Sequence, residues 1–151
     1  DAVTVNPYMG DDAIVPFARE DKMVFVLAKT SNKPVHSLQD VALTRGGCLA
    51  DYAARVAQEL DEEHRNIGLV VGATSADAVA RMRSLSPQQW FLVPGIGAQG
   101  GDLDATLRAG LRVDGQGLLI NASRAIWQAP DAGAAARELT GQINQLRSVS
   151  V

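Results

Sequence analysis

The sequence predicts an α/β protein built around a parallel sheet. Short runs of apolar residues, often β-branched, alternate along the chain with stretches in which apolar residues recur at helical spacing. The expected strands are apolar on both faces, as is typical of parallel strands buried between or inside layers of helix. A length of 151 residues and an apolar content of 46% fit one ordinary folded domain over 1–151.

Five strands are expected, and each ends at a turn or at polar residues. The first ends where Pro7 removes a backbone donor, and the second leads into the polar exit KTSN at 29–32. In chain order the expected strands cover residues 2–5, 23–28, 67–71, 90–93 and 118–121.

Four helices are expected in the intervals between and after these strands. In the first, apolar residues at positions 49, 52, 53, 56 and 60 form one stripe over three turns. Ser75 can cap the second helix, and Gly110 is the expected stop of the third. The helices are expected over residues 48–60, 75–83, 103–109 and 132–146, and residues 33–47 are expected to form a mobile loop.

Chain length leaves two architectures open. A closed eight-stranded α/β barrel needs about 250 residues. Five strand–helix repeats match either an open doubly wound sheet or an incomplete barrel. The sequence opens directly on a strand with no leading segment, which we take as a sign that it is part of a longer chain.

Composition disfavours several classes of protein. The formal charge of −3 argues against a general nucleic-acid binder, and no apolar run approaches the length of a membrane span. Cys48 stands alone, which excludes an internal disulfide and a thiolate metal site. His36 and His64 have no second ligand nearby, so no metal is expected. We therefore expect a cytoplasmic protein that binds neither nucleic acid nor membrane.

Glycines mark the most informative segment, WFLVPGIGAQGGD at 90–102. Four of them follow a strand and precede a helix: Gly95, Gly97, Gly100 and Gly101. Such a loop leaves backbone N–H groups unobstructed, and the following helix turns its partially positive end toward it, which favours an anion. One repeat later Arg124 follows the next strand. Because parallel strand ends share one face, Gln99 and Arg124 are expected to hold one phosphate.

Two other interpretations of these residues stay open. In the first, the glycines serve only to form a tight turn, and Arg124 is a solvated surface charge. The segment 95–100 also fits a GxGxxG dinucleotide motif. That motif needs an acidic residue after the next strand, where NASR stands at 121–124, and Asp114 precedes the strand instead. A phosphate site is the stronger interpretation.

Six short motifs are spread over nearly the whole chain. They are DAVTVNPYMG at 1–10, PF at 16–17, LAKTSN at 27–32, VGATS at 71–75, VPGIGAQGGD at 93–102 and INASR at 120–124. Together they resemble the orotidine 5′-phosphate decarboxylase family, in particular its shorter bacterial-type branch. The resemblance implies a (β/α)8 TIM barrel, of which this chain covers roughly strand 4 to the C-terminal helix.

The resemblance also implies an activity. The family decarboxylates orotidine 5′-monophosphate to uridine 5′-monophosphate in de novo pyrimidine synthesis, as a homodimer and with neither metal nor organic cofactor. By the same resemblance Gln99 and Arg124 hold the substrate phosphate, and the Gln99 loop folds over the nucleotide. Ser31 hydrogen-bonds the pyrimidine ring, with Asn32 as a second candidate. The residues implied to line the base pocket are Pro94 and Ile96.

One departure from the family concerns catalysis. The resemblance places the catalytic residues in Asp-x-Lys-x-x-Asp on the third strand, where the lysine protonates the carbanion at C6, and no such motif occurs in these 151 residues. Without a cation beside the carbanion the main electrostatic contribution is lost. We therefore expect the catalytic residues upstream of Asp1, none within this chain, and no activity from the chain alone. The alternative is a non-catalytic nucleotide-binding module with an open sheet.

Overall fold

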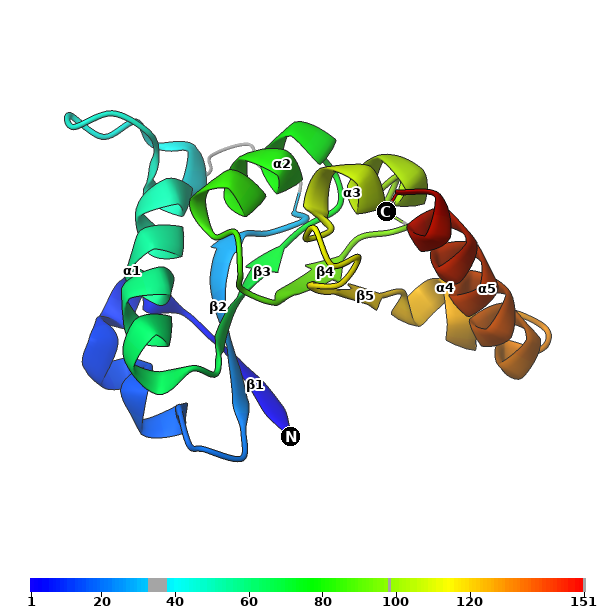
Figure 1. The fold of residues 1–151 in the computed structure, drawn as a ribbon, viewed down its shortest axis with the longest axis horizontal. Coiled ribbons are helices and arrows are strands. Elements are labelled where there is room, and N and C mark those ends of the chain that lie inside the picture. The colour runs from blue at the N-terminus through cyan, green and yellow to red at the C-terminus, as the bar shows by residue number, and fades with distance from the viewer. Residues whose placement is uncertain (33–37, 98, 151) are drawn as a thin grey trace.

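One parallel sheet organises the computed structural model, which describes residues 1–32, 38–97 and 99–150 (Figure 1). In this part of the chain its five strands are β1 (Ala2–Val5), β2 (Met23–Lys29), β3 (Ile67–Val71), β4 (Phe91–Pro94) and β5 (Leu118–Asn121). They lie side by side in chain order, and every neighbouring pair is parallel. A doubly wound sheet reverses its strand order at a switch point. The open doubly wound alternative is therefore wrong, and the sheet is a section of an α/β barrel.

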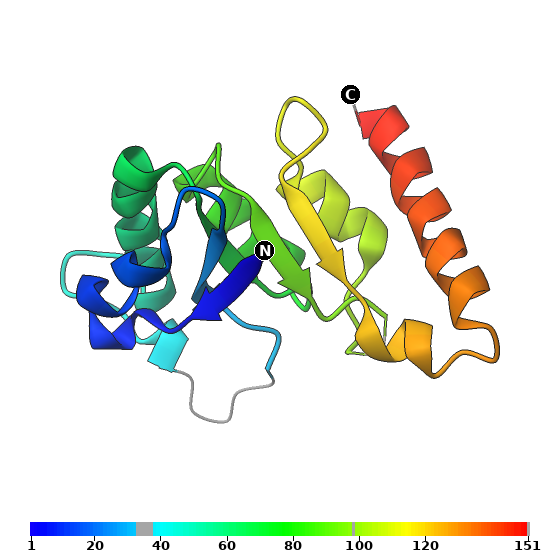
Figure 2. The same ribbon diagram turned by 90° about the horizontal axis from the view of Figure 1, so that it is seen from below.

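The α-helices follow the strands, and those that connect one strand to the next cover one face of the curled sheet (Figures 1 and 2). They are α1 (Leu49–His64), α2 (Ala76–Leu85), α3 (Leu103–Gly110), α4 (Ser123–Trp127) and α5 (Ala132–Ser150). Between β1 and β2 the chain instead forms three 3-10 turns, η1 (Pro7–Met9), η2 (Asp11–Ala13) and η3 (Val15–Phe17). The five strands and four helices expected from the sequence are confirmed with shifts at their ends. The short α4 and the 3-10 turns were not expected.

The expected loop over 33–47 is only partly described. Residues 33–37, where part of that prediction falls, lie outside the described residues. The rest contains a fourth 3-10 turn, η4 (Leu38–Asp40), and an isolated antiparallel bridge between Ala42 and Cys48 just before α1.

The main core lies between the sheet and the helices, and α1 enters it through small side chains. Its strand residues are Val24, Val26, Ala28, Ile67, Leu69, Val71, Phe91 and Val93, and its α1 residues are Ala50, Ala53, Ala54 and Ala57. The stripe predicted for this helix is therefore partly wrong, because Tyr52 is exposed and Val56 lines a cavity. Alanines let the helix axis lie close to the strands, and the larger side chains are left on a neighbouring face.

The concave face of the sheet is also apolar. Leu27, Val70, Leu92 and Leu119 are successive partners in the strand register and form one row across it. Next to this row Phe25 lies over Gly68, where an added Cβ would be 2.9 Å from its ring. Leu119, on the last strand, is 45% exposed. An apolar concave face is what a section of a barrel interior presents.

Arg83 of α2 joins four segments at the end of the sheet opposite the strand exits. Its guanidinium donates hydrogen bonds of 2.7 to 3.0 Å to the main-chain carbonyls of Ser86, Gln89, Gly110 and Gly117. It also lies 3.7 Å from the centre of the Phe91 ring. Burial, helped by the nearby Arg112 guanidinium, lowers the pKa of Arg83 to about 10, so the group is cationic at neutral pH.

We expect Arg83→Met to destabilise the protein strongly, because four carbonyls lose their shared donor. Urea denaturation of the full-length protein should show an unfolding free energy lower by about 3 kcal/mol or more. Arg108→Met is the matched control, since this exposed arginine of α3 pairs with the exposed Asp104 one turn away. Equal unfolding midpoints for the two variants would contradict the role assigned to Arg83.

Candidate functional site

The glycine-rich loop after β4 is a compact turn that depends on backbone conformations favoured by glycine. Gly95, Gly97 and Gly100 have φ angles of +104°, +69° and +87°. The N–H groups of Gly97, Gly100 and Gly101 donate to carbonyls within the loop, at 2.8 to 3.1 Å. These amides are therefore already used in closing the turn that carries Gln99.

The N-terminus of α3, which the sequence analysis expects to favour an anion, carries acidic residues of its own. The carboxylate of Asp102 caps the helix and accepts a hydrogen bond of 3.0 Å from the Ala105 N–H. Asp104 adds a second negative charge in the first turn. Because the helix end is occupied by its own acidic residues, anion binding at this loop is left to side chains.

A cavity of about 300 Å³ lies where the segments after β2, β4 and β5 meet. Its walls include Ser31, Pro94, Ile96, Gln99, Ser123 and Arg124. The structure thus brings together four of the five predicted site residues and also Ile96. Asn32 is the exception: it is exposed and is not among the described residues that line the cavity.

A hydrogen bond joins two of the predicted site residues that line this cavity. The Ser31 hydroxyl donates to Oε1 of Gln99 at 3.0 Å and so connects segments 68 positions apart. The Gln99 oxygen is then occupied, and its NH₂ group is the end that can donate to an anion. No sequence pattern indicated this bond, because it depends on how the loops after β2 and β4 meet in space.

Glycines set the position of Ser31. A Cβ on Gly72 would lie 2.5 Å from the Ser31 backbone nitrogen and 2.6 Å from its Cα. A Cβ on Gly95 would lie 3.0 Å from the Ser31 Cβ and 3.2 Å from Oε1 of Gln99. The missing side chains at these two positions therefore let Ser31 approach both β3 and the Gln99 loop.

Arg124 belongs to the short helix α4, which begins directly after β5. Beside it, the Ser123 hydroxyl donates to the Asn121 carboxamide at 3.0 Å. Within residues 1–32, 38–97 and 99–150, no carboxylate forms an ion pair with the Arg124 guanidinium. A cation at a cavity wall with no carboxylate of its own is suited to a bound anion.

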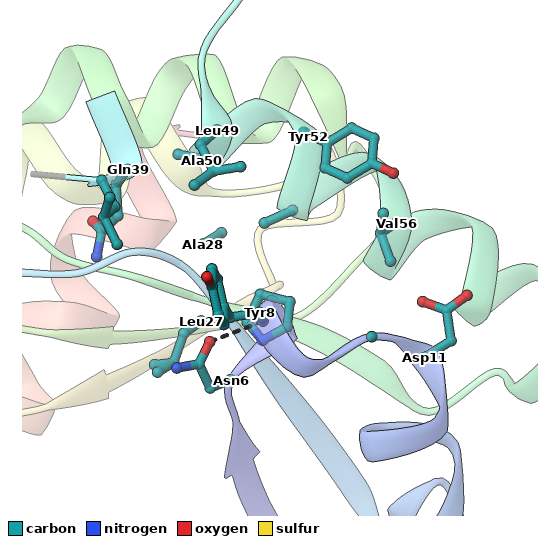
Figure 3. A pocket seen from close by; sticks show the side chains of 14 residues that line it. Asn6, Tyr8, Asp11, Leu27, Ala28, Gln39, Leu49, Ala50, Tyr52 and Val56 are labelled. Atoms are coloured by element: carbon teal, nitrogen blue, oxygen red, sulfur yellow. Dashed lines mark hydrogen bonds between the residues drawn. The ribbon is translucent and has the colours of Figure 1, made fainter. Parts of the chain in front are cut away.

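A second, larger cavity of about 600 Å³ lies between α1 and the segment after β1 (Figure 3). Its lining is mostly apolar and includes Leu27, Leu49 and Val56. Asn6, a polar strand exit in the sequence, lies here, but its side chain accepts a hydrogen bond of 3.0 Å from the Tyr8 N–H and caps η1. Because the lining is mostly apolar and the Asn6 side chain serves a local turn, this cavity is the weaker candidate for binding a charged ligand.

The first residue of the chain serves the sheet and not the site. Asp1 is exposed and comes directly before β1, and its main-chain carbonyl accepts a hydrogen bond of 2.9 Å from the Met23 N–H at the start of β2. It is not among the described residues that line the smaller cavity. The expectation that the catalytic residues lie upstream of Asp1 concerns residues outside this sequence, so it stays a prediction.

Neither a metal centre nor a membrane segment is found in the described part of the chain. No group of three or more His, Cys, Asp or Glu side chains there is placed to share a metal ion. No helix there combines the length and apolar content that crossing a bilayer requires.

Comparison with known proteins identifies the family. The model of the orotidine 5′-phosphate decarboxylase / HUMPS family matches residues 1–139. The chain belongs to this family. Among curated orotidine 5′-phosphate decarboxylases, that of Roseiflexus sp. is 50% identical over 127 residues, which are 83% of this chain and 47% of that protein. That of Halobacterium salinarum is 42% identical over 158 residues, with 97% and 58% covered. The resemblance drawn from the sequence motifs is confirmed.

Solved structures in the orotidine 5′-phosphate decarboxylase family share the fold. Leishmania donovani OMP decarboxylase is 49% identical with a TM-score of 0.89, and 97% of this chain covers 57% of it. Leishmania donovani UMP synthase is 52% identical with a TM-score of 0.91, and 97% of this chain covers 33% of it. The chain thus spans about half the length of the curated relatives it matches. The predicted partial TIM barrel is confirmed.

We expect Gly72→Ala to separate Ser31 from Gln99, because the added methyl group would overlap backbone atoms that cannot simply rotate away. A crystal structure of the variant should show no hydrogen bond between the two side chains. The unfolding free energy should fall by about 1 to 3 kcal/mol. Gly141→Ala in α5 is the control, since nothing lies within 4 Å of its added Cβ, and it should be stabilising. A Gly72→Ala variant of wild-type stability that keeps the bond would contradict this account.

Proposed function

We propose that this chain provides the phosphate- and base-binding part of an enzyme that decarboxylates orotidine 5′-monophosphate to uridine 5′-monophosphate. The observation that carries the proposal is that Gln99 and Arg124, from the exits of adjacent strands β4 and β5, line one cavity together with Ser31. The names of the similar curated proteins and of the Leishmania structures support the same activity.

The nucleotide would be held at two ends of the smaller cavity. Arg124 binds the phosphate through its guanidinium, and Gln99 donates from its free NH₂ group. Because the Ser31 hydroxyl already donates to Gln99, its oxygen faces the pyrimidine as an acceptor and suits the ring N–H. Pro94 and Ile96 form apolar walls for the ring. Asn32 lies outside the wall, so the base contact is assigned to Ser31.

The lysine that protonates C6 is assigned to a part of the full-length enzyme upstream of Asp1. Asp-x-Lys-x-x-Asp does not occur among the 151 residues. Lys22 forms an ion pair with the adjacent Asp21 before β2, and Lys29 donates to Asp40. The third lysine, at position 33, lies outside the described residues. The two described lysines are therefore each held by a carboxylate.

The assembly and compartment of the enzyme belong to the same proposal. The family resemblance supports a homodimer that needs no metal or organic cofactor, and the single cysteine supports a cytoplasmic location. The competing idea of a complete non-catalytic module rested on an open doubly wound sheet. The sequential strand order removes that support.

Arg124→Ala in the full-length protein should weaken binding of uridine 5′-monophosphate about ten- to a hundredfold, because a charged hydrogen-bonding partner of the phosphate is lost. Uridine has no phosphate, so its affinity should change little. Isothermal titration calorimetry measures both. Arg108→Ala, on the outer surface of α3, is the control and should bind both ligands like the wild type. Equal losses for nucleotide and nucleoside would count against a phosphate role.

The isolated 151-residue chain should not decarboxylate orotidine 5′-monophosphate, because no preplaced lysine stabilises the developing carbanion. The loss of substrate absorbance should proceed at the rate of a blank without protein. A reproducible rate above that blank would mean that a lysine of this chain acts as the acid.

A further inference from the structure

Two consecutive residues of η4 hold the two residues that come directly before Ser31. Lys29 at the end of β2 donates to a carboxylate oxygen of Asp40 at 2.5 Å. The Thr30 N–H donates to Oε1 of Gln39 at 3.0 Å, and Nε2 of Gln39 donates back to the Thr30 hydroxyl at 3.0 Å. The exit of β2 is thereby fixed against η4 immediately before the site residue.

The Gln39 contact differs from the Lys29 contact in what it constrains. An ion pair between long side chains tolerates movement of either backbone. The Gln39 carboxamide instead bonds the backbone and the side chain of the same residue, Thr30, at a partly buried position. Two bonds from one planar group fix the orientation of the Thr30 backbone. Because Ser31 is joined to Thr30 by the next peptide bond, its position depends on that orientation.

The position of Ser31 has little tolerance. Its backbone lies so close to Gly72 that a methyl group there has no room, and its side chain lies in tight contact with Gly95. Its hydroxyl must also stay within reach of Oε1 of Gln99. A change in direction at Thr30 would move the Ser31 hydroxyl away from Gln99.

We propose that Gln39 is a positioning residue that keeps the Ser31 hydroxyl bonded to Gln99, so that the Gln99 amide is oriented before the nucleotide arrives. Gln39 is not among the described residues that line the smaller cavity. It lines the larger one, beside Leu49 and Ala50 (Figure 3), and it acts through Thr30. The effect on nucleotide binding rests on the proposed function, whereas the effect on Ser31 does not.

The test is a double-mutant cycle in the full-length protein. Gln39→Leu removes both bonds at similar volume and should weaken binding of uridine 5′-monophosphate about three- to tenfold, as expected for the loss of neutral hydrogen bonds. In a Ser31→Ala background the same change should have no further effect, because the group that Gln39 positions is absent. Gln88→Leu, an exposed glutamine before β4, is the matched control with wild-type affinity.

A second measurement does not depend on the ligand. Crystal structures of Gln39→Leu and Gln88→Leu should show the Ser31–Gln99 bond lost in the first and kept in the second. An intact bond in Gln39→Leu overturns the inference, and so does an equal, additive loss of affinity in both backgrounds. If the wild type binds no uridine 5′-monophosphate but Gln39→Leu still loses the bond, the proposed function fails and the positioning role stands.

Discussion

Close backbone contact between the loops at the strand exits is the constraint on which the site depends. Gly72 after β3 leaves room for Ser31 after β2, and Gly95 lets the same serine reach the loop after β4. Gly101 continues the contact, since a Cβ there would lie 2.6 Å from the Gly95 carbonyl oxygen and 2.9 Å from the Ala73 side chain. A side chain at any of these glycines would push two loops apart. The hydrogen bond from Ser31 to Gln99 exists because three strand exits meet almost backbone to backbone.

Some charged residues stabilise the fold, and others remain available to bind a ligand. Asp51 of α1 is buried, caps its own helix at Cys48 and accepts two hydrogen bonds from Arg81 of α2. The Arg81 bonds in particular hold the pKa of Asp51 below its usual value, so it is ionised at neutral pH. Arg83 is likewise committed to main-chain carbonyls. Arg124 lines a cavity with no described carboxylate paired to it, which is the arrangement a binding cation needs.

Sequence patterns predicted the parts of this structure that depend on local chemistry. The strands were identified because their residues are apolar on both faces, and the exits at 29–32, 95–101 and 121–124 were identified because polar or glycine residues interrupt them. Periodicity misled on α1, because alanines carry little hydrophobic signal although they form the buried face. The five-residue α4 has too few turns to show a period.

Local sequence patterns could not show the features that depend on contacts between distant segments. The strand order is a property of the whole sheet, and both candidate architectures contain the same strands and helices. Asp102 and Asp104 stand at the N-terminus of α3 and make it less favourable for an anion than the sequence pattern indicated. Helix direction alone indicated a positive end, but whether that end is free depends on the first residues of the helix themselves. Side-chain pairs such as Ser31 and Gln99 need the three-dimensional arrangement.

Under the proposed function, the phosphate-binding residues lie away from the carbon that reacts, and this determines how they contribute to catalysis. Arg124 and Gln99 act on a part of the substrate that does not react, so their interactions contribute by orienting the nucleotide and not by stabilising charge at C6. Ser31 connects the two tasks, because one hydroxyl bonds the phosphate-binding amide and faces the base. Correct placement of the phosphate is thus coupled to correct placement of the ring within this half of the barrel. The positioning role that we infer for Gln39 uses the same coupling: Gln39 lies outside the smaller cavity and acts on it through the backbone of Thr30, which precedes Ser31.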